Sequence, residues 1–467
     1  MLPTKIRHQP IIHSYHFCRS TIHSFSPGSL AYGFWSFGGL DLNCSQCHAK
    51  QIALMKELIR YRYLAITLSI FISVVVVFTK CMNKEEEHPG IIQNSNGQIF
   101  AGSATCANCH KDIYDSHLKT AHHLTSGIAS KEYIRGSFET GKNSYAYDDE
   151  RTVAMEERTD GFYQVAYNDG TEKEAHRFDI VIGSGTMGQS YLTWKKDRLF
   201  QLPITYFSAA NQWSNSPGYP NKIIFNRTIT SRCLECHSTF AKTVSPPGVE
   251  PEKFDRTQMI YGVSCEKCHG PAAQHVEFQT QHPTIKIAQY IINPARLTRQ
   301  QNLDLCASCH GGRLKKSRPS FEFTVGDTLS RFFMLDTTAP NPDQIDVHGN
   351  QYGLLRASKC FRLSDTLTCN TCHNAHENEK GRIALFSSRC MNCHNTTHGK
   401  SCKMTAFIGP AINDNCIDCH MPLKPSRAIA VFLPGSTAPT AALIRSHYIS
   451  IYPDETKKIL DYIKNQH

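Results

Sequence analysis

The residues in this sequence that are best suited to bind a cofactor are its cysteines and histidines, which recur in one short pattern. Sixteen of the 20 cysteines fall in eight copies of Cys-x-x-Cys-His, and Cys18, Cys81, Cys360 and Cys402 lie outside them. Chance would give roughly 0.04 copies in a chain with this many cysteines and histidines. The first copy is Cys44/Cys47/His48, and the others are Cys106/Cys109/His110, Cys233/Cys236/His237, Cys265/Cys268/His269, Cys306/Cys309/His310, Cys369/Cys372/His373, Cys390/Cys393/His394 and Cys416/Cys419/His420.

This spacing predicts covalent attachment of haem. Two thiols three positions apart form thioethers with two carbons on one edge of a porphyrin, and the adjacent histidine binds the iron. A zinc ribbon needs two cysteine pairs on one ion and no histidine after each pair. A disulfide-stapled secreted scaffold explains many cysteines but not the histidines that follow them. Haem c is therefore the expected cofactor.

An apolar segment near the N-terminus predicts export. Residues 64–78 are uncharged and apolar, and Lys56, Arg60 and Arg62 precede them, as in a signal sequence or a short membrane anchor. Cys81 follows directly and is a candidate for lipidation, although Lys80 stands where such proteins usually carry a small residue. We expect residues 55–81 to be the signal or anchor segment, with lipidated Cys81 and an uncleaved anchor as the alternatives.

Residues 1–54 precede this targeting segment and show no periodicity. Met55 opens a stretch that resembles the start of a signal peptide, so we expect residues 1–54 not to be part of the native protein. The copy at Cys44 would then carry no haem. About seven haems are expected in the exported chain.

The exported part is expected to be mainly α with extensive coil, folded around a haem-templated core, because segments this short between motifs cannot each build an apolar core. A small antiparallel β module is predicted at about 140–230, where strand-like alternation is interrupted by the turn Asn168-Asp169-Gly170. The expected organisation is a tether at 82–100, a first haem segment at 101–139, the β insert at 140–230, a multihaem domain at 231–425, and a C-terminal tail and helix at 426–467.

The second axial ligand of each iron decides whether that haem is closed or open to substrate. Histidines outside the motifs are the candidates, and those next to a motif are favoured. A full set of such ligands would favour electron transfer, whereas His237 has no neighbouring histidine and marks the best candidate for an open iron. The candidate distal ligands are His117, His122, His275, His348, His376, His398 and His447.

Charge and the remaining cysteines add two expectations. The formal charge is +10, but no basic stripe with interleaved aromatic residues is present, so no nucleic-acid partner is expected. Haem propionates would offset the basic excess. Cys360 and Cys402 are unpaired thiols for an oxidising compartment, and we expect a disulfide between them.

Several motifs and their flanks resemble one known group of proteins, the multihaem cytochromes related to the tetrahaem electron carrier of ammonia oxidisers. The resemblance is carried by residues 105–110, 262–271, 368–376 and 416–422 within roughly 100–450. That superfamily also contains pentahaem nitrite reductases and octahaem hydroxylamine oxidoreductases, so it implies either a carrier or an enzyme. The Cys-x-x-Cys-Lys motif typical of the nitrite reductases is absent from this sequence.

The sequence therefore predicts a membrane-tethered electron carrier, exported to the periplasm or cell surface, that exchanges electrons with redox partner proteins. The alternative is a reductase or oxidase of a small nitrogen or sulfur compound at one open haem. A haem-bearing scaffold without redox turnover is a third class, disfavoured by the number of motifs.

Overall fold

The computed structural model describes residues 55–57, 59–73, 90–246, 248–335, 341–395, 397 and 401–464. The chain divides into two compact units, Met1–Glu85 and Glu86–His467. Described residues 55–57 and 59–73 of the first unit are helical. Among the described residues, no helix is both long enough and apolar enough to cross a membrane. Cys81, the motif at Cys44 and residues 82–89 of the expected tether lie outside the described residues.

A four-stranded antiparallel sheet forms one edge of the second unit. Its order is β2 (Ser144–Ala146), β3 (Arg151–Arg158), β4 (Gly161–Asn168) and β5 (Thr171–Arg177). Asn168 pairs with Thr171, so Asp169 and Gly170 form a two-residue turn in which both have positive φ, at 49° and 68°. This is the backbone that twists a tight hairpin correctly, and aspartate followed by glycine adopts it readily.

A seven-stranded sheet packs beside the first one. Its main path runs β1 (Ser126–Ile128), β6 (Ile180–Ile182), β7 (Gly188–Lys195), β8 (Arg198–Gln201) and β11 (Arg227–Thr228), and β9 (Ile204–Phe207) and β10 (Gln212–Asn215) join through β7. Trp213, Tyr191 and Phe178 lie in the shared apolar core, and each is at most 2% exposed. The two sheets therefore have a conventional side-chain core.

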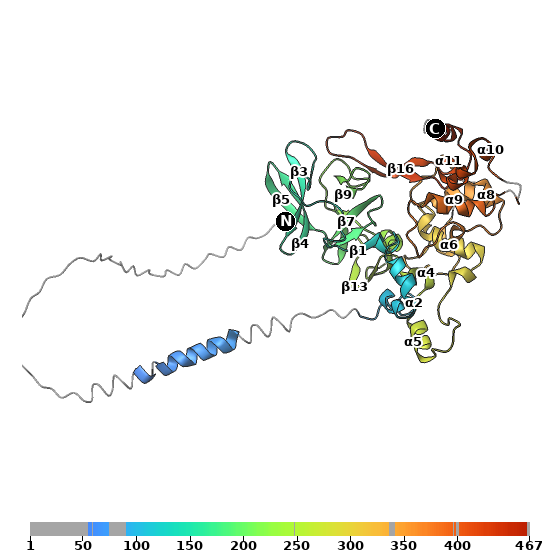
Figure 1. The fold of residues 1–467 in the computed structure, drawn as a ribbon. Helices are drawn as coiled ribbons and strands as arrows, with labels where there is room; N and C mark the ends of the chain where they lie inside the picture. The colour runs from blue at the N-terminus through green and yellow to red at the C-terminus, as the bar shows by residue number, and fades with distance from the viewer. Residues whose placement is uncertain are drawn as a thin grey trace, which may run out of the picture. The chain divides into compact units, whose positions relative to one another are not determined.

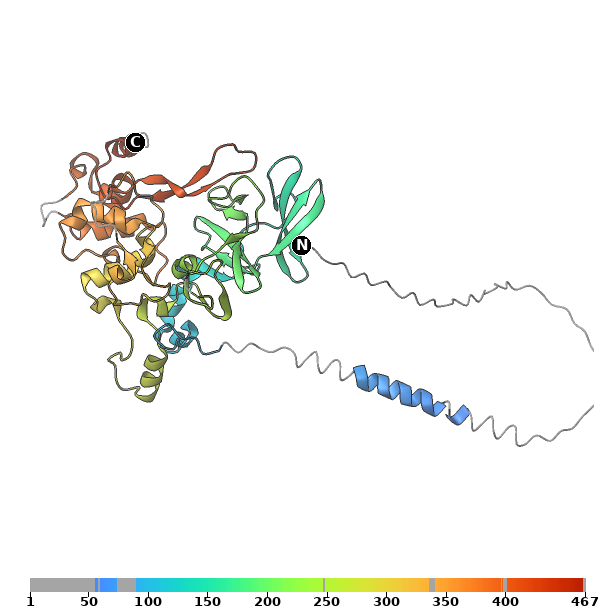
Figure 2. The same ribbon diagram turned by 180° about the vertical axis from the view of Figure 1, so that it is seen from behind.

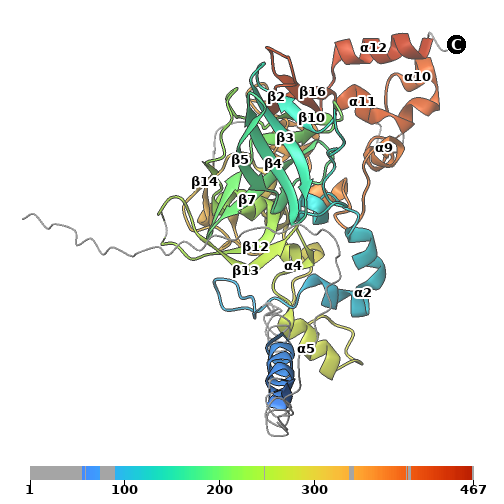
Figure 3. The ribbon, with the colours of Figure 1, turned by 90° about the vertical axis from the view of Figure 1, so that its left-hand side faces the viewer.

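The motifs lie in a region of short helices, which gathers on the opposite side of the second unit from the sheets (Figure 1). Figure 2 shows the same division from behind. In Figure 3, α9 to α12 gather at one end, and α2, α4 and α5 at the other. The α-helices are α2 (Ser103–His117), α3 (Ser231–His237), α4 (Cys265–His269), α5 (Ala273–Gln281), α6 (Arg299–His310), α7 (Gln351–Ala357), α8 (Lys359–Arg362), α9 (Ile383–Met391), α10 (Thr405–Ile408), α11 (Cys416–His420) and α12 (Pro453–Lys464).

Single 3-10 turns and three small two-stranded sheets complete the unit. The 3-10 turns are η1 (His123–Thr125), η2 (Pro294–Arg296), η3 (Leu329–Arg331), η4 (Cys369–Thr371) and η5 (Pro410–Asp414). The small sheets pair β12 (Ser238–Thr243) with β13 (Phe254–Tyr261), β14 (Lys315–Lys316) with β15 (Phe333–Met334), and β16 (Leu423–Val431) with β17 (Thr440–Arg445).

The expectation of a mainly α protein is wrong, because strands contribute to the fold throughout the second unit. β1, β12 and β13 lie outside the expected insert, and β16 and β17 lie in and around the expected C-terminal tail. Strands β16 and β17 form a hairpin, here called the tail hairpin, which packs Val431 and Ala442 against Phe207 of β9. The sequence concealed these strands because their alternating burial is short and is interrupted by bulges, as between Pro425 and Ala430. The class is mixed.

Candidate haem-binding site

Each described motif lies on a helical turn that brings its three functional side chains together. Helices α3, α4, α6 and α11 end at the motif histidine, and α2 is kinked at His110. In two other motifs the same turn is visible as a bond from the histidine backbone N–H to the carbonyl four residues earlier, at 3.0 Å for both His373 and His394. Residues three and four apart share a helix face. Both thiols and the imidazole can therefore reach one porphyrin.

Thiols of different motifs meet in pairs. Cys106 interacts with Cys265, Cys236 with Cys309, Cys306 with Cys369, and Cys390 with Cys416, and the elements that carry them are in contact in each case. None of the sixteen described cysteines forms a disulfide. Within each pair, the shared proton lowers the pKa of one thiol, to about 6 for Cys265 and about 5 for Cys309. The attachment edges of these motifs are therefore direct neighbours.

Two further proximities link the pairs into one row. Burial, with the nearby charges of Cys309 and Cys265, raises the pKa of Cys268 to about 11. Burial and then the charge of Cys360, with a smaller effect of Cys393, raise the pKa of Cys372. The motifs therefore follow one another in space in the order Cys106, Cys265, Cys306, Cys369, Cys390 and Cys416, each motif being named by its first cysteine. The motif at Cys233 branches from the one at Cys306.

The motif thiols differ in their exposure to solvent. A core built around the attachment sites would bury them, but Cys109 is not buried. Cys109 is exposed, as are Cys233 and Cys393. Its motif stands at the end of the row, where the other thiol, Cys106, is the one that meets Cys265. The packing of α2 therefore leaves Cys109 facing solvent, and its attachment to haem stays a prediction that rests on its spacing from Cys106.

The expected disulfide between Cys360 and Cys402 is not formed. Both thiols are free. Cys360 lies near Cys372 and Cys393, whereas Cys402 lies near Cys419. The two cysteines therefore belong to the surroundings of different motifs.

The motif histidines are oriented through one ring nitrogen. Nδ1 of His269 lies 2.9 Å from the Ile292 carbonyl, and Nδ1 of His420 lies 2.8 Å from the Ser450 carbonyl. Nδ1 of His310 lies 3.2 Å from the side-chain oxygen of Gln351. Each acceptor holds the proton on Nδ1 and leaves Nε2 unprotonated, the form in which a histidine binds a metal.

Other histidines face the motif histidines at the separation that an iron between them requires. An imidazole nitrogen binds a metal at about 2 Å, so two rings on opposite sides of one ion have centroids roughly 6 Å apart. The centroids of His122 and His310 are 6.1 Å apart, and those of His269 and His376 are 6.0 Å apart. His447 lies 6.1 Å from His373. The residues present thus fit haem iron with two histidine ligands.

His348 lies near His237, the motif histidine that has no histidine close to it in the sequence. Desolvation, and then the proximity of His348, lowers the pKa of His237 to about 4. Desolvation likewise lowers the pKa of His122 and His447 to about 4. These rings are therefore neutral at physiological pH, as iron ligands must be.

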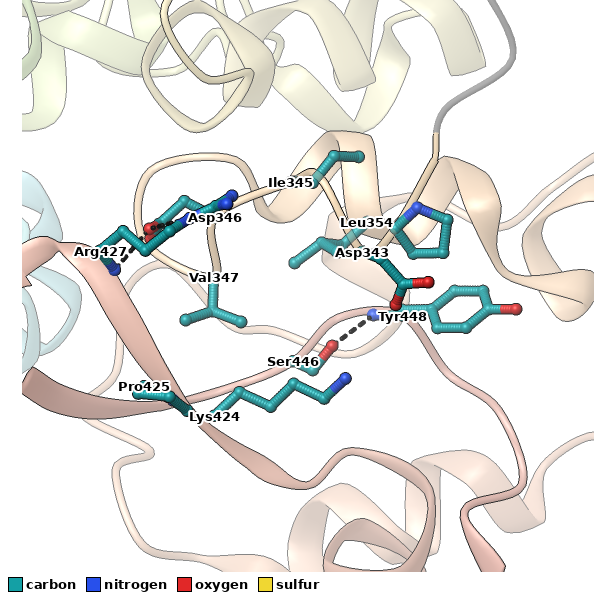
Figure 4. Close-up of a pocket in the computed structure, with 11 residues that line it drawn as sticks. Asp343, Ile345, Asp346, Val347, Leu354, Lys424, Pro425, Arg427, Ser446 and Tyr448 are labelled. Atoms are coloured by element: carbon teal, nitrogen blue, oxygen red, sulfur yellow. Dashed lines mark hydrogen bonds and ion pairs between the residues drawn. The ribbon is translucent and has the colours of Figure 1, made fainter.

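Hydrogen bonds between Asp346 and the tail hairpin fix the loop that carries His348. The Asp346 carboxylate accepts hydrogen bonds from the backbone N–H of His348 at 2.8 Å and from that of Arg427 at 2.6 Å, and it also accepts one from Ser426 Oγ at 2.9 Å. Figure 4 shows Asp346 facing Arg427 at the rim of a pocket of about 270 Å³ between this loop, β16 and Tyr448. The hairpin therefore positions a candidate ligand.

The remaining candidates are less uniform. His275 lies close to His269, and its Nδ1 is 2.8 Å from the Gln289 carbonyl. His117 is buried, and its Nε2 forms a hydrogen bond with the Val263 carbonyl at 3.0 Å. Its Nδ1 is also buried and has no partner among the described atoms. His398 lies outside the described residues.

Sequence reasoning passed over His123. Its ring is half-buried and lies 6.0 Å from that of His117, and desolvation lowers its pKa. Its position beside His122 was the only signal in the sequence.

Comparison with known proteins found three likenesses to cytochromes. Residues 190–270 match the family described as cytochrome c554 and c-prime. The multiheme cytochrome MtrA of Shewanella baltica (strain OS185) is 26% identical over 191 residues, which are 40% of this chain and 51% of that protein. The chain thus spans about half the length of this curated relative. The outer cell wall cytochrome OcwA aligns over 77% of this chain and 81% of its own, at 15% identity and a TM-score of 0.47.

The motifs, the facing histidines and the first two of these likenesses define the class: the chain is a multihaem c-type cytochrome, and haem c is its cofactor.

Proposed function

We propose that this protein is an exported, membrane-tethered cytochrome that carries electrons along a row of about seven covalently bound haems. The observation that carries this proposal is the continuous succession of motif thiols from Cys106 through Cys265, Cys306, Cys369 and Cys390 to Cys416. When bound, each haem supplies an iron that alternates between ferric and ferrous states. Electron transfer slows steeply with distance, so attachment edges in contact favour transfer from motif to motif.

The chain's own residues then set the ligation. The thiols would hold each haem covalently, the motif histidine would supply one ligand to its iron, and a facing histidine such as His122, His376 or His447 would supply the second. His348 near His237 supports closure of the iron that the sequence marked as open. Closed irons favour electron transfer over substrate chemistry.

Export rests on the segment 55–81, whose apolar run and basic flank are those of a signal or anchor, with Cys81 as the candidate lipid attachment site. We further propose that the chain is related to the tetrahaem carrier of ammonia oxidisers, as the motif flanks suggest, and that its partners are redox proteins.

Spectroscopy of the purified holoprotein tests the proposal. Intact mass should correspond to about seven haems, and electron paramagnetic resonance should show low-spin ferric haems that do not change when nitrite, hydroxylamine or cyanide is added. The reduced protein should pass its electrons to an exogenous oxidised cytochrome. A high-spin signal that shifts with one of these small molecules would instead favour the reductase or oxidase alternative.

A further inference from the structure

Charged residues cluster at the branch motif, Cys233/Cys236/His237. Glu235, between the two cysteines, is only 6% exposed, and it forms ion pairs with Arg232 at 2.8 Å and with Lys316 at 2.7 Å. Glu235 also accepts a hydrogen bond from the Phe321 backbone N–H at 2.9 Å. The cluster is therefore built into the interior, because its carboxylate is fully partnered.

The cluster carries a net positive charge, because two cations share one carboxylate. Lys316 is only 16% exposed, so solvent screens its charge weakly. Both cations also lie over the Phe333 ring, with Arg232 4.9 Å and Lys316 4.2 Å from its centroid. Lys267 lies near enough to disfavour the charge on Lys316, while a further nearby carboxylate, that of Glu252, is bound by the backbone N–H and the hydroxyl of Ser231.

Arg232 lies at the attachment edge of the branch motif, and Lys316 is joined to it through Glu235. Nη1 of Arg232 is 3.3 Å from the Cys236 sulfur, and Nη2 is 3.2 Å from the Ser308 carbonyl of the neighbouring motif. The propionates of a haem lie on the edge opposite the carbons that the cysteines bind. The cations are therefore not arranged to neutralise the propionates of the haem attached here, and their charge acts on its iron.

A second, independent feature separates this haem from those of His269 and His420. His237 Nδ1 lies 3.0 Å from the hydroxyl oxygen of Thr125, whereas His269 and His420 donate to backbone carbonyls. A hydroxyl accepts a hydrogen bond more weakly than an amide carbonyl does. A weaker acceptor leaves the imidazole less basic, so it stabilises ferric iron less.

From these two features we propose that the haem attached through Cys233 and Cys236 has the highest midpoint potential in the chain and serves as an electron-accepting side branch of the row. Nearby positive charge favours ferrous iron, which carries one positive charge fewer than ferric iron. One electron passes from the ferrous iron of the haem at Cys306 and Cys309 to the ferric iron at the branch, and no bond is made or broken. This inference rests on the proposed function.

The test is a potentiometric titration of the holoprotein, followed by its visible spectrum. In Lys316→Met, which keeps an apolar stem over Phe333, the component of highest potential should move to lower potential. Lys316→Arg should restore it. Lys315→Met is the matched control, because Lys315 is the adjacent exposed lysine, and it should leave every component in place.

The variant Thr125→Val tests the second feature, the weak hydrogen-bond acceptor of His237, without changing any charge. Loss of the hydroxyl acceptor should move the same component to higher potential, while the haem content stays at the wild-type value. An unchanged highest component in Lys316→Met, or a shift confined to another component, overturns the inference. These potentials are measured independently of electron passage to a partner, so a failure of the proposed function would be recognised separately.

Discussion

At the scale of single residues, histidines of identical chemistry have different roles because of what each ring faces. His269 follows a cysteine pair and faces His376, whereas His282 packs on Phe278 with ring centroids 4.7 Å apart. Only a ring that opposes a motif histidine at roughly 6 Å can close an iron. The facing ring, and not the abundance of histidine, therefore predicts ligation.

Replacement of His376 tests this at one haem. In His376→Ala, one haem should change from low-spin to high-spin, because its iron loses one axial ligand while both thioethers persist. Electron paramagnetic resonance of the ferric protein would show the change, and the haem content should not fall.

His282→Ala is the matched control and should leave the spectrum unchanged. A fully low-spin spectrum in His376→Ala would remove His376 from the ligand set.

At the scale of elements, ion pairs join neighbouring motif segments where little apolar core exists. Arg389 of α9 binds the Glu379 carboxylate through both terminal nitrogens, one of them at 2.9 Å, and donates to the Cys372 carbonyl at 2.6 Å. Glu379 is 6% exposed and also accepts from the Asn374 backbone N–H at 3.0 Å. This pair links the turn of one motif to the helix of the next.

Glu379→Gln should destabilise the holoprotein by roughly 3 kcal/mol at pH 7, because it leaves the Arg389 guanidinium without its buried counter-charge. Hydrogen bonding to Arg389 lowers the pKa of Glu379 below its usual value of 4.5. The pair is therefore at full strength above about pH 4.5 and weakens as the pH falls through the lower folded-state pKa, so the difference between variant and wild type should shrink in acid.

Denaturant unfolding followed by circular dichroism at several pH values measures this. Glu377→Gln is the control, since Glu377 faces Arg382 at 3.7 Å with both side chains exposed, and an exposed pair contributes at most about 1 kcal/mol. Equal losses in the two variants would contradict the structural role of the Glu379 pair.

At the scale of the whole molecule, the sheets and the motif region provide different kinds of core. The sheets bury large side chains such as Trp213, whereas the motif region consists of short turns around thiols and imidazoles. The tail hairpin connects the two, because Asn215 of β10 donates its backbone N–H to the Phe432 carbonyl at 3.1 Å. The same hairpin holds the His348 loop through Asp346.

Membrane tethering also concerns the whole molecule. If Cys81 is lipidated, a labelled fatty acid should be incorporated into the wild type, and the protein should fractionate with membranes. Cys81→Ser should abolish the label and release the protein if no uncleaved anchor remains. Export with retention at the membrane but without label would support the anchor, and recovery in the cytoplasm would contradict export.

The sequence by itself determined the class of cofactor and predicted its points of attachment, because each motif carries two thiols and one histidine within five residues. It also determined the turn at Asp169 and Gly170, since local backbone preference suffices there. It could not determine which histidine faces which iron. His122 and His310, or His373 and His447, lie far apart in the chain, and only tertiary folding brings their rings together.

The same limit applies to the order of the motifs and to the fold class. The motif at Cys106 adjoins the one at Cys265, not the next in the chain, because the thiols meet through the packing of α2 on α4. The small hairpins among the motifs have too little periodic sequence to be recognised, and they form through contacts with distant segments. Local chemistry therefore identified this protein as a multihaem cytochrome, whereas long-range contacts decided which motifs lie next to one another.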